Sequence, residues 1–386
     1  MKPVIYGLSG PALTPDEASF FRSAEPVGFI LFGRNIVDRP QLRALTDSLR
    51  ELTGRDDLPI LIDQEGGRVA RMKPPEWPAF PAGPAFDRLY DLAPQSAIQA
   101  ARANAQAIGL MLAEAGITVD CLPLLDVAQP DTTEAISTRA YGREPMRVAA
   151  LGRAVLEGLA AGGVVGVVKH MPGHGRAIVD SHHLLPTVTA SEAELEIDLE
   201  PFHSLAGAPM GMTSHIVFEA WDRERPATLS PVIIEEVIRG RIGFDGLLMT
   251  DDIDMKALSG TAGEKAAGAV AAGCDVVLDC WARMHEMEDI AGRLGDMPER
   301  ARAARPGDGD AEAGGRRHGR ADRAAGCVPR ARLKRDESGK VPRAPLDGAH
   351  VTGGICDGRL QRNALARSGR GRDPAARRRA VLRDDG

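Results

Sequence analysis

The sequence predicts a (β/α)8 TIM barrel, an α/β fold, and three observations support it. Short apolar runs alternate with amphipathic stretches along the first 300 residues, as in a parallel sheet covered by helices. There are eight such runs, which favours a closed barrel over an open doubly wound sheet. Polar residues follow the runs, where the loops of such a barrel build a ligand site. We therefore expect residues 1–300 to form one catalytic domain.

The expected strands recur from the amino terminus to residue 279. Each is a short apolar run of the kind found in strands that are buried on both faces of a parallel sheet. In chain order they cover residues 4–9, 28–32, 59–63, 119–126, 164–170, 210–215, 247–251 and 275–279.

Between the strands, apolar residues recur at helical spacing. These patterns predict helices over residues 42–52, 97–115, 145–161, 192–205 and 231–238. After the last strand, one apolar face predicts a closing helix; its residues are Met284, Met287, Ile290, Ala291 and Leu294.

Composition and cysteine usage indicate a cytoplasmic protein. The hydrophobic fraction of 43% and the charged fraction of 26% are ordinary for a globular chain. No apolar run reaches the roughly 18 residues of a membrane span, and the amino terminus lacks the apolar stretch of a secretory signal. Cys121, Cys274 and Cys280 lie in apolar runs without CxxC spacing, so we expect buried thiols in a reducing compartment.

Residues 301–386 differ in character from the rest of the chain. They are rich in Arg, Gly and Ala, carry an excess of basic residues and lack apolar periodicity, although the net charge of the whole chain is −6. One interpretation is a basic tail that binds an anionic partner such as nucleic acid. The other, which we favour, is that a GC-rich gene is read out of frame here. Both predict a disordered, non-catalytic tail, and we expect no nucleic-acid or membrane partner.

The densest group of titratable residues follows the fifth expected strand, as KHMPGHG at 169–175 and DSH at 180–182. Asp180 can orient the imidazole of His182 as a general acid/base needs, although the same spacing also occurs in surface loops. Lys169 and His170 end the strand at the barrel mouth, where they suit sugar hydroxyls or a substrate carbonyl. His174, between two glycines, fits a role in holding the loop's shape.

Two further strand ends carry acids. Asp251 and Asp252 follow the seventh expected strand, where Asp251 can act as an anionic nucleophile; such a pair can equally cap the next helix. Asp63 and Arg71 follow the third strand and offer complementary contacts to a hydroxyl-rich ligand, with a Gly pair between them that permits close backbone approach.

These motifs carry a family resemblance. The segments at 63–71, 137–142, 169–182 and 249–255 resemble those of bacterial β-N-acetylhexosaminidases of glycoside hydrolase family 3, and most closely the single-domain cytoplasmic type of peptidoglycan recycling. The likeness runs from about residue 7 to about residue 300, and that family's fold is a TIM barrel. Met171 stands where Phe is usual, Ile253 and Asp254 alter the segment after the nucleophile, and the tail does not resemble the family's end.

The resemblance implies a retaining double displacement without metal or cofactor, in a monomer. The implied substrate is a non-reducing β-linked N-acetylglucosamine on 1,6-anhydro-N-acetylmuramic acid, with or without its peptide. The implied roles are Asp251 as nucleophile and His182 as acid/base assisted by Asp180. The implied binders of the terminal sugar are Asp63, Arg71, Arg139, Lys169 and His170.

Three alternatives remain open from the residues. A metal-dependent barrel hydrolase would use ligands from among His170, His174, His182, His215 and Asp251, although the first strand lacks the HxH typical of amidohydrolases. A non-catalytic sugar-binding protein would not need Asp251 together with Asp180 and His182. A histidine acid/base also allows phosphate to replace water as the acceptor.

Overall fold

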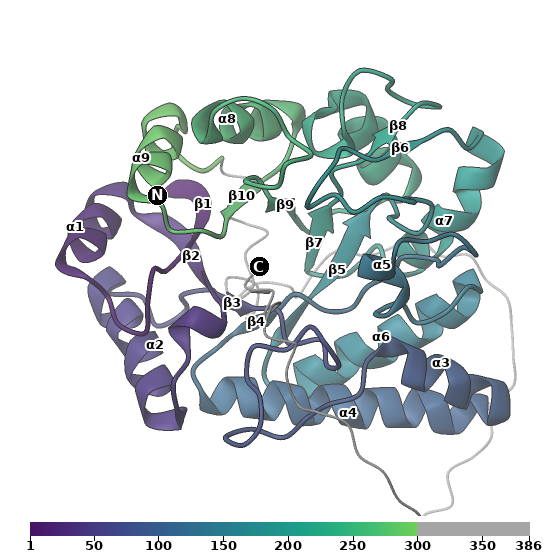
Figure 1. Cartoon of the computed structure of the whole chain (residues 1–386), viewed down its shortest axis with the longest axis horizontal. Coiled ribbons are helices and arrows are strands. Elements are labelled where there is room, and N and C mark those ends of the chain that lie inside the picture. Colours follow the sequence, from purple (N-terminus) through teal and green to yellow (C-terminus); the bar gives the residue numbers. More distant parts are fainter. Residues whose placement is uncertain (299–386) are drawn as a thin grey trace, which may run out of the picture. The chain divides into compact units, whose positions relative to one another are not determined.

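The computed structural model describes residues 1–298 and contains a closed, eight-stranded parallel barrel, which confirms the predicted fold class (Figure 1). Around the barrel the strands follow the order β1, β10, β9, β7, β5, β4, β3, β2. Their bounds are β1 Lys2–Gly7, β2 Pro26–Leu31, β3 Ile60–Ile62, β4 Val119–Asp120, β5 Val165–Met171, β7 Met210–Thr213, β9 Leu247–Asp252 and β10 Val276–Asp279.

All eight expected strands are present, and β4 differs most from its prediction. Its ladder ends at Asp120, whereas the apolar run predicted a strand to residue 126. Pro123 has no N–H to donate, so it interrupts the ladder. The chain still follows β5, because the Leu125 N–H donates to the Lys169 carbonyl at 2.6 Å. The carboxylate of Asp126 therefore still reaches the barrel mouth.

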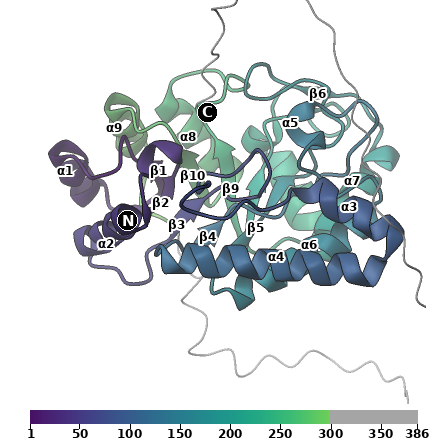
Figure 2. The same ribbon diagram turned by 60° about the horizontal axis from the view of Figure 1, so that its bottom comes forward.

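Helices surround the barrel, and each predicted helical range contains one. These are α2 Arg39–Thr53, α4 Pro94–Glu114, α6 Pro145–Ala161, α7 Glu192–Ser204, a π-helix over Ile233–Arg241 and α9 Met284–Arg293. Others lie outside those ranges: α1 Pro15–Ala24, α3 Gly83–Leu92, α5 Glu134–Ser137 and α8 Ala262–Ala272. The two longest, α4 and α6, pack side by side against one flank of the barrel (Figure 2).

The core has two layers, because alternate strand residues face inward and outward. On β10, Val276 and Leu278 lie in the interior cluster, whereas Val277 packs in the outer cluster between sheet and helices. Cys121 and Cys280 also lie in the interior cluster, and they and Cys274 are buried free thiols, as expected.

A second, two-stranded parallel sheet was not predicted. β6 (Thr187–Val188) lies in the segment after β5, and it pairs with β8 (Val217–Phe218), which lies in the segment after β7. Two-residue strands are too short to show a periodic pattern. This sheet anchors the far end of the loop that begins after β5 and carries Asp180 and His182.

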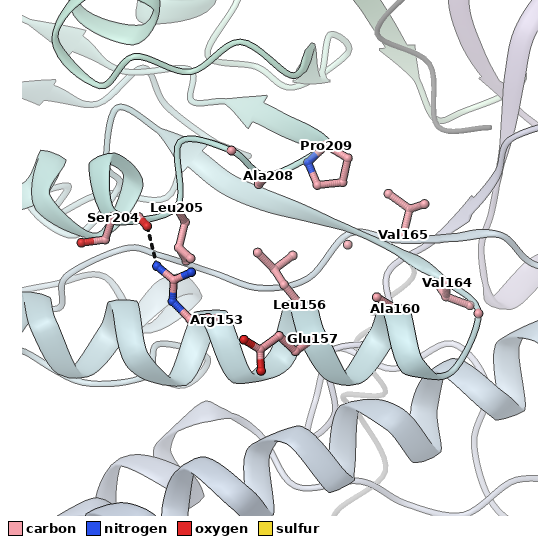
Figure 3. Close-up of a pocket in the computed structure, with 13 residues that line it drawn as sticks. Arg153, Leu156, Glu157, Ala160, Val164, Val165, Ser204, Leu205, Ala208 and Pro209 are labelled. Carbon is pink, nitrogen blue, oxygen red and sulfur yellow. Dashed lines mark hydrogen bonds between the residues drawn. The ribbon is translucent and has the colours of Figure 1, made fainter. Parts of the chain in front are cut away.

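A pocket of about 540 Å³ lies away from the barrel mouth. Arg153 and Leu156 of α6 line it together with Val164, Leu205 and Pro209, and the last three lie near the amino-terminal ends of β5 and β7 (Figure 3). The predicted site residues follow the carboxyl ends of the strands, so this pocket is not the candidate site.

Within residues 1–298, no helix is long and apolar enough to cross a membrane. The predictions made for residues 301–386 lie outside the described residues.

Candidate active site

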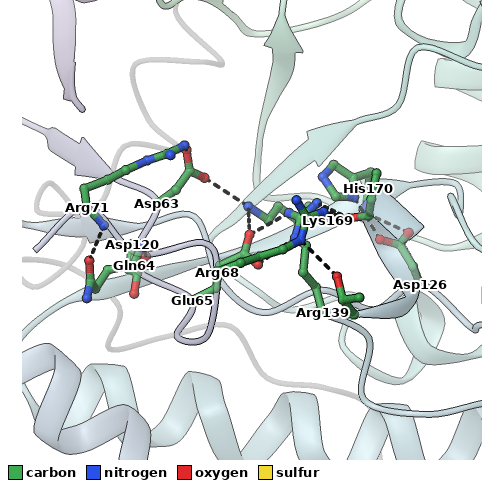
Figure 4. Close-up of polar contacts among 12 residues, drawn as sticks. Asp63, Gln64, Glu65, Arg68, Arg71, Asp120, Asp126, Arg139, Lys169 and His170 are labelled. Carbon is green, nitrogen blue, oxygen red and sulfur yellow. Dashed lines mark hydrogen bonds and ion pairs between the residues drawn. The ribbon is translucent and has the colours of Figure 1, made fainter. Parts of the chain in front are cut away.

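One wall of the barrel mouth is built from paired charges. The Lys169 ammonium, at the end of β5, lies 3.1 Å from Asp63 Oδ1 and 2.7 Å from Glu65 Oε1 (Figure 4). The Arg139 guanidinium donates two hydrogen bonds, of 2.6 and 2.8 Å, to the Glu65 carboxylate. We call Asp63, Glu65, Arg139 and Lys169 the charge network. The network brings three of the predicted binding residues together.

Glu65 is the member of the network that the sequence analysis did not single out. Burial raises the pKa of its carboxyl, but the positive charges of Arg139 and Lys169 outweigh burial and hold the pKa at about 2. For the Lys169 ammonium the directions are reversed, because burial lowers its pKa and the negative charges of Glu65 and Asp63 raise it by more. All of these groups are therefore charged at neutral pH. The sequence signal that could have identified Glu65 was its spacing, because it lies two residues after Asp63 in the same motif.

Arg71 extends this wall toward solvent. Its Nη2 lies 3.4 Å from Asp63 Oδ2, and its guanidinium stacks 5.2 Å from the centre of the Phe32 ring. Asp63 and Arg71 are partly exposed, unlike the buried Lys169 and Glu65. Their outer edges can accept and donate hydrogen bonds to a ligand that enters the mouth.

His170 is held by Asp126, a second residue to which the sequence analysis gave no role. The Nδ1 of His170 lies 2.8 Å from Asp126 Oδ2, and the backbone N–H groups of His170 and His174 donate to Oδ1. Burial raises the pKa of Asp126, but His170 and its hydrogen bond lower it to about 2. An ionised carboxylate only accepts, so Nδ1 carries the hydrogen and Nε2 is left for a ligand. The signal for Asp126 was its position at a strand end.

Asp251 is the next-to-last residue of β9, at the same mouth. Its Oδ1 accepts a hydrogen bond of 2.8 Å from the backbone N–H of Asp252. Burial raises the pKa of Asp251, but the charges of three histidines, His170, His215 and His182, together lower it. The carboxylate is thus anionic at neutral pH, as a nucleophile must be.

The pair Asp180 and His182 lies on the loop between β5 and β6. Asp180 Oδ1 bonds both the Nδ1 of His182, at 2.7 Å, and its backbone N–H, at 3.0 Å. Burial raises the pKa of Asp180, but these bonds and the charge of His182 lower it. The arrangement leaves Nε2 of the imidazole as the atom that can exchange a proton with a ligand.

The chain matches the glycosyl hydrolase family 3 N-terminal domain over residues 15–300. This chain belongs to glycosyl hydrolase family 3. It is 39% identical over 285 residues to a β-hexosaminidase of Chromobacterium violaceum, covering 72% of this chain and 78% of that one. The resemblance drawn from the motifs is therefore confirmed, and the chain is a glycosidase of the β-hexosaminidase type.

Solved structures agree with this assignment. NagZ from Neisseria gonorrhoeae, in complex with N-trifluoroacetyl-D-glucosamine, superposes with a TM-score of 0.69 at 32% identity, over 76% of this chain and 88% of that chain. A family 3 β-N-acetylglucosaminidase from Paenibacillus gives a TM-score of 0.71 at 32% identity; the match covers 78% of this chain but only 59% of that longer one.

Two other histidines of this family 3 enzyme, His174 and His215, have partners within the protein. His174 is buried and its Nε2 lies 3.2 Å from Ser181 Oγ; burial, and then the charge of His170, lower its pKa to about 4. The ring of His215 bonds the Thr228 hydroxyl and the Asp252 carbonyl. Among residues 1–298, no three His, Cys, Asp or Glu side chains are grouped so as to hold a metal ion.

Proposed function

We propose that this enzyme removes β-linked N-acetylglucosamine from the non-reducing end of peptidoglycan fragments in the cytoplasm. Its substrate would be N-acetylglucosaminyl-1,6-anhydro-N-acetylmuramic acid, with or without peptide. The main support is that a lowered-pKa carboxylate, Asp251, and a hydrogen-bonded pair, Asp180 and His182, interact at one barrel mouth. The glucosamine derivative named for the Neisseria structure supports the terminal sugar.

The charge network would bind that sugar together with Arg71 and His170. Asp63 and Arg71 offer their partly exposed edges to hydroxyl groups, and His170 offers Nε2. Lys169 and Arg139 are already bonded to acids, so they present a donor array whose geometry is fixed before substrate arrives.

The chemistry would take two displacements. In the first, an Asp251 carboxylate oxygen attacks the anomeric carbon while Nε2 of protonated His182 gives its proton to the leaving oxygen, which departs as an alcohol. In the second, neutral His182 takes a proton from water, the water oxygen attacks the same carbon, and Asp251 leaves as a carboxylate. Asp180 accepts from Nδ1 throughout and stabilises the charged imidazolium.

The first test compares p-nitrophenyl N-acetyl-β-glucosaminide with the β-glucoside, with and without EDTA. We expect turnover of the N-acetyl substrate only, resistant to EDTA and reduced about a thousandfold or more in Asp251→Asn. Asp245→Asn is the matched control, since this exposed residue precedes the opposite end of β9. Wild-type rates in Asp251→Asn would overturn the assignment of the nucleophile, and loss of activity in EDTA would indicate the metal-dependent alternative.

The substrate itself is tested with disaccharides. We expect a higher kcat/KM for the anhydromuramyl disaccharide than for N,N′-diacetylchitobiose, which has the same terminal sugar. Equal values would overturn the peptidoglycan assignment while leaving the hexosaminidase activity in place.

A further inference from the structure

Trp281 lies at the rim of the mouth, immediately after β10. Its indole is 41% exposed, although its Nε1–H donates to Asp252 Oδ2 at 3.1 Å. The backbone N–H of Asp252 in turn bonds Asp251 Oδ1. One edge of a large aromatic ring is thus anchored to Asp252, the residue that follows the proposed nucleophile in the chain.

Two guanidinium groups lie near this ring. The guanidinium of Arg34 lies 6.0 Å from the indole centre and 4.8 Å from the Phe32 ring, and Arg283 lies 5.9 Å from the indole. Arg34 is itself fixed by hydrogen bonds to the Leu8 and Cys280 carbonyls. The orientation of the indole is therefore set before any ligand binds.

The stacked groups also connect Trp281 with the sugar-binding wall. Arg71, which pairs with Asp63 of the charge network, stacks on the Phe32 ring, which Arg34 also contacts. A continuous series of planes, Arg71, Phe32, Arg34 and Trp281, runs from the wall to the rim. A ligand longer than one sugar that leaves the wall along this series meets the indole.

The other two tryptophans are less exposed than Trp281. Trp77 is buried, and Trp221 packs on Phe218 with ring centres 5.4 Å apart. Packing within the fold therefore accounts for most of the contacts of those two rings, whereas much of the Trp281 side chain lies in solvent beside the barrel mouth. Exposed aromatic surface at such a place is typical of a ligand contact.

We propose that Trp281 is the platform on which the leaving-group sugar rests, a subsite for a pyranose ring. This rests on the proposed function, in which the charge network and Asp251 hold the terminal sugar and the second sugar emerges at the rim. A pyranose presents a face of C–H groups, which carry partial positive charge and pack on the electron-rich face of an indole. Trp281 would thus select substrates whose leaving group is a sugar.

The test compares two substrates that differ only in the leaving group. The leaving group of N,N′-diacetylchitobiose is a sugar. The leaving group of N-acetyl-β-glucosaminyl fluoride is a single atom, which cannot reach the platform. We expect Trp281→Ala to lower the ratio of kcat/KM for chitobiose to that for the fluoride about tenfold, through KM. Trp281→Phe keeps a ring but loses the bond to Asp252, and should keep that ratio within about twofold.

Two outcomes overturn the platform. An unchanged ratio in Trp281→Ala shows that the leaving sugar does not use the ring. Equal losses of kcat on both substrates, in the Phe variant as in the Ala variant, show that Trp281 acts only by positioning Asp252. The natural substrate is judged separately, since equal wild-type rates on chitobiose and the anhydromuramyl disaccharide would overturn that assignment and leave the platform intact.

Discussion

The charge network and the acid/base pair meet at one mouth but are built in opposite ways. Lys169 and Glu65 are 2% and 4% exposed, and each of them contacts more than one opposite charge. His182 and Asp180 are 59% and 31% exposed and bond to each other locally on a loop. Both regions place ionised groups around the same proposed ligand.

This difference reflects what each region must do. A buried charge without a partner is expensive, so a network that binds uncharged hydroxyls must neutralise itself and in doing so becomes part of the fold. An acid/base must gain and lose a proton in each cycle. Exposure makes that exchange inexpensive, because solvent accommodates both charge states. We therefore expect mutations in the network to affect stability and mutations in the loop to affect catalysis.

The largest effect is expected for His182→Ala. Loss of the proton donor should lower kcat/KM about 10²–10⁴-fold for a disaccharide, whose leaving alcohol needs protonation, and far less for the activated p-nitrophenyl glycoside. Denaturant unfolding should be unchanged, because the side chain is exposed. Equal losses on both substrates would contradict the acid role, and a large loss of stability would contradict the proposed separation between the regions.

The next effect is expected for Glu65→Gln, which is nearly isosteric but uncharged. It leaves Lys169 and Arg139 short of a buried counter-charge, so the free energy of unfolding should fall by about 3–5 kcal/mol. The pKa of Glu65 is about 2 in the fold, below its ordinary value of 4.5. Its contribution to stability is therefore present above about pH 4.5 and lost as the pH falls toward 2. Urea unfolding across that range should show less acid sensitivity in the variant.

The matched control for this variant is Asp180→Asn, which makes the equivalent change in the loop. It should change the free energy of unfolding by less than about 0.5 kcal/mol, since it breaks a largely exposed contact. If the two variants lose similar stability, burial is not what distinguishes the two regions.

The fold was largely predictable because a parallel barrel repeats one strong signal. Each strand is buried on both faces and therefore reads as an apolar run, and α6 was predicted with the bounds it has, Pro145–Ala161. The β6–β8 sheet was missed because two residues carry no pattern. The end of β4 was misplaced because its apolar run continues past Pro123.

The site was predictable where chemistry shows in residue type and motif. Asp251, His182 and Lys169 stand out as polar groups at strand ends or in a dense loop. Lys169 and Asp251 lie near the carboxyl ends of β5 and β9 and His182 lies on the loop after β5, while their roles stay predictions. The partners of such groups were harder to find. Glu65 and Asp126 act through three-dimensional contacts with Arg139 and His170, which are far away in the chain and which sequence spacing does not report.

The smallest effect tests the rule of buried charges at an acid that forms no salt bridge among the described residues. Asp279, at the end of β10, is buried, and neither carboxylate oxygen has a hydrogen-bond partner among the described residues. Burial, followed by the charges of Asp252 and Glu286, raises its pKa to about 7, whereas Glu65 sits at about 2. The neutral acid is the form that suits the fold, so its contribution to stability is full below about pH 4 and is lost as the pH rises through 7.

Between pH 6 and 8 that loss amounts to about 1 kcal/mol. Asp279→Asn keeps the shape of the side chain and removes its ionisation, so the variant should lack this part of the decline in unfolding free energy. The measurement is the difference between wild type and variant across the pH range, because Asp252, whose pKa burial raises to about 6, contributes a decline of its own. Parallel curves would mean that Asp279 is ionised in the fold and has found a cation, and its contrast with the charge network would then disappear.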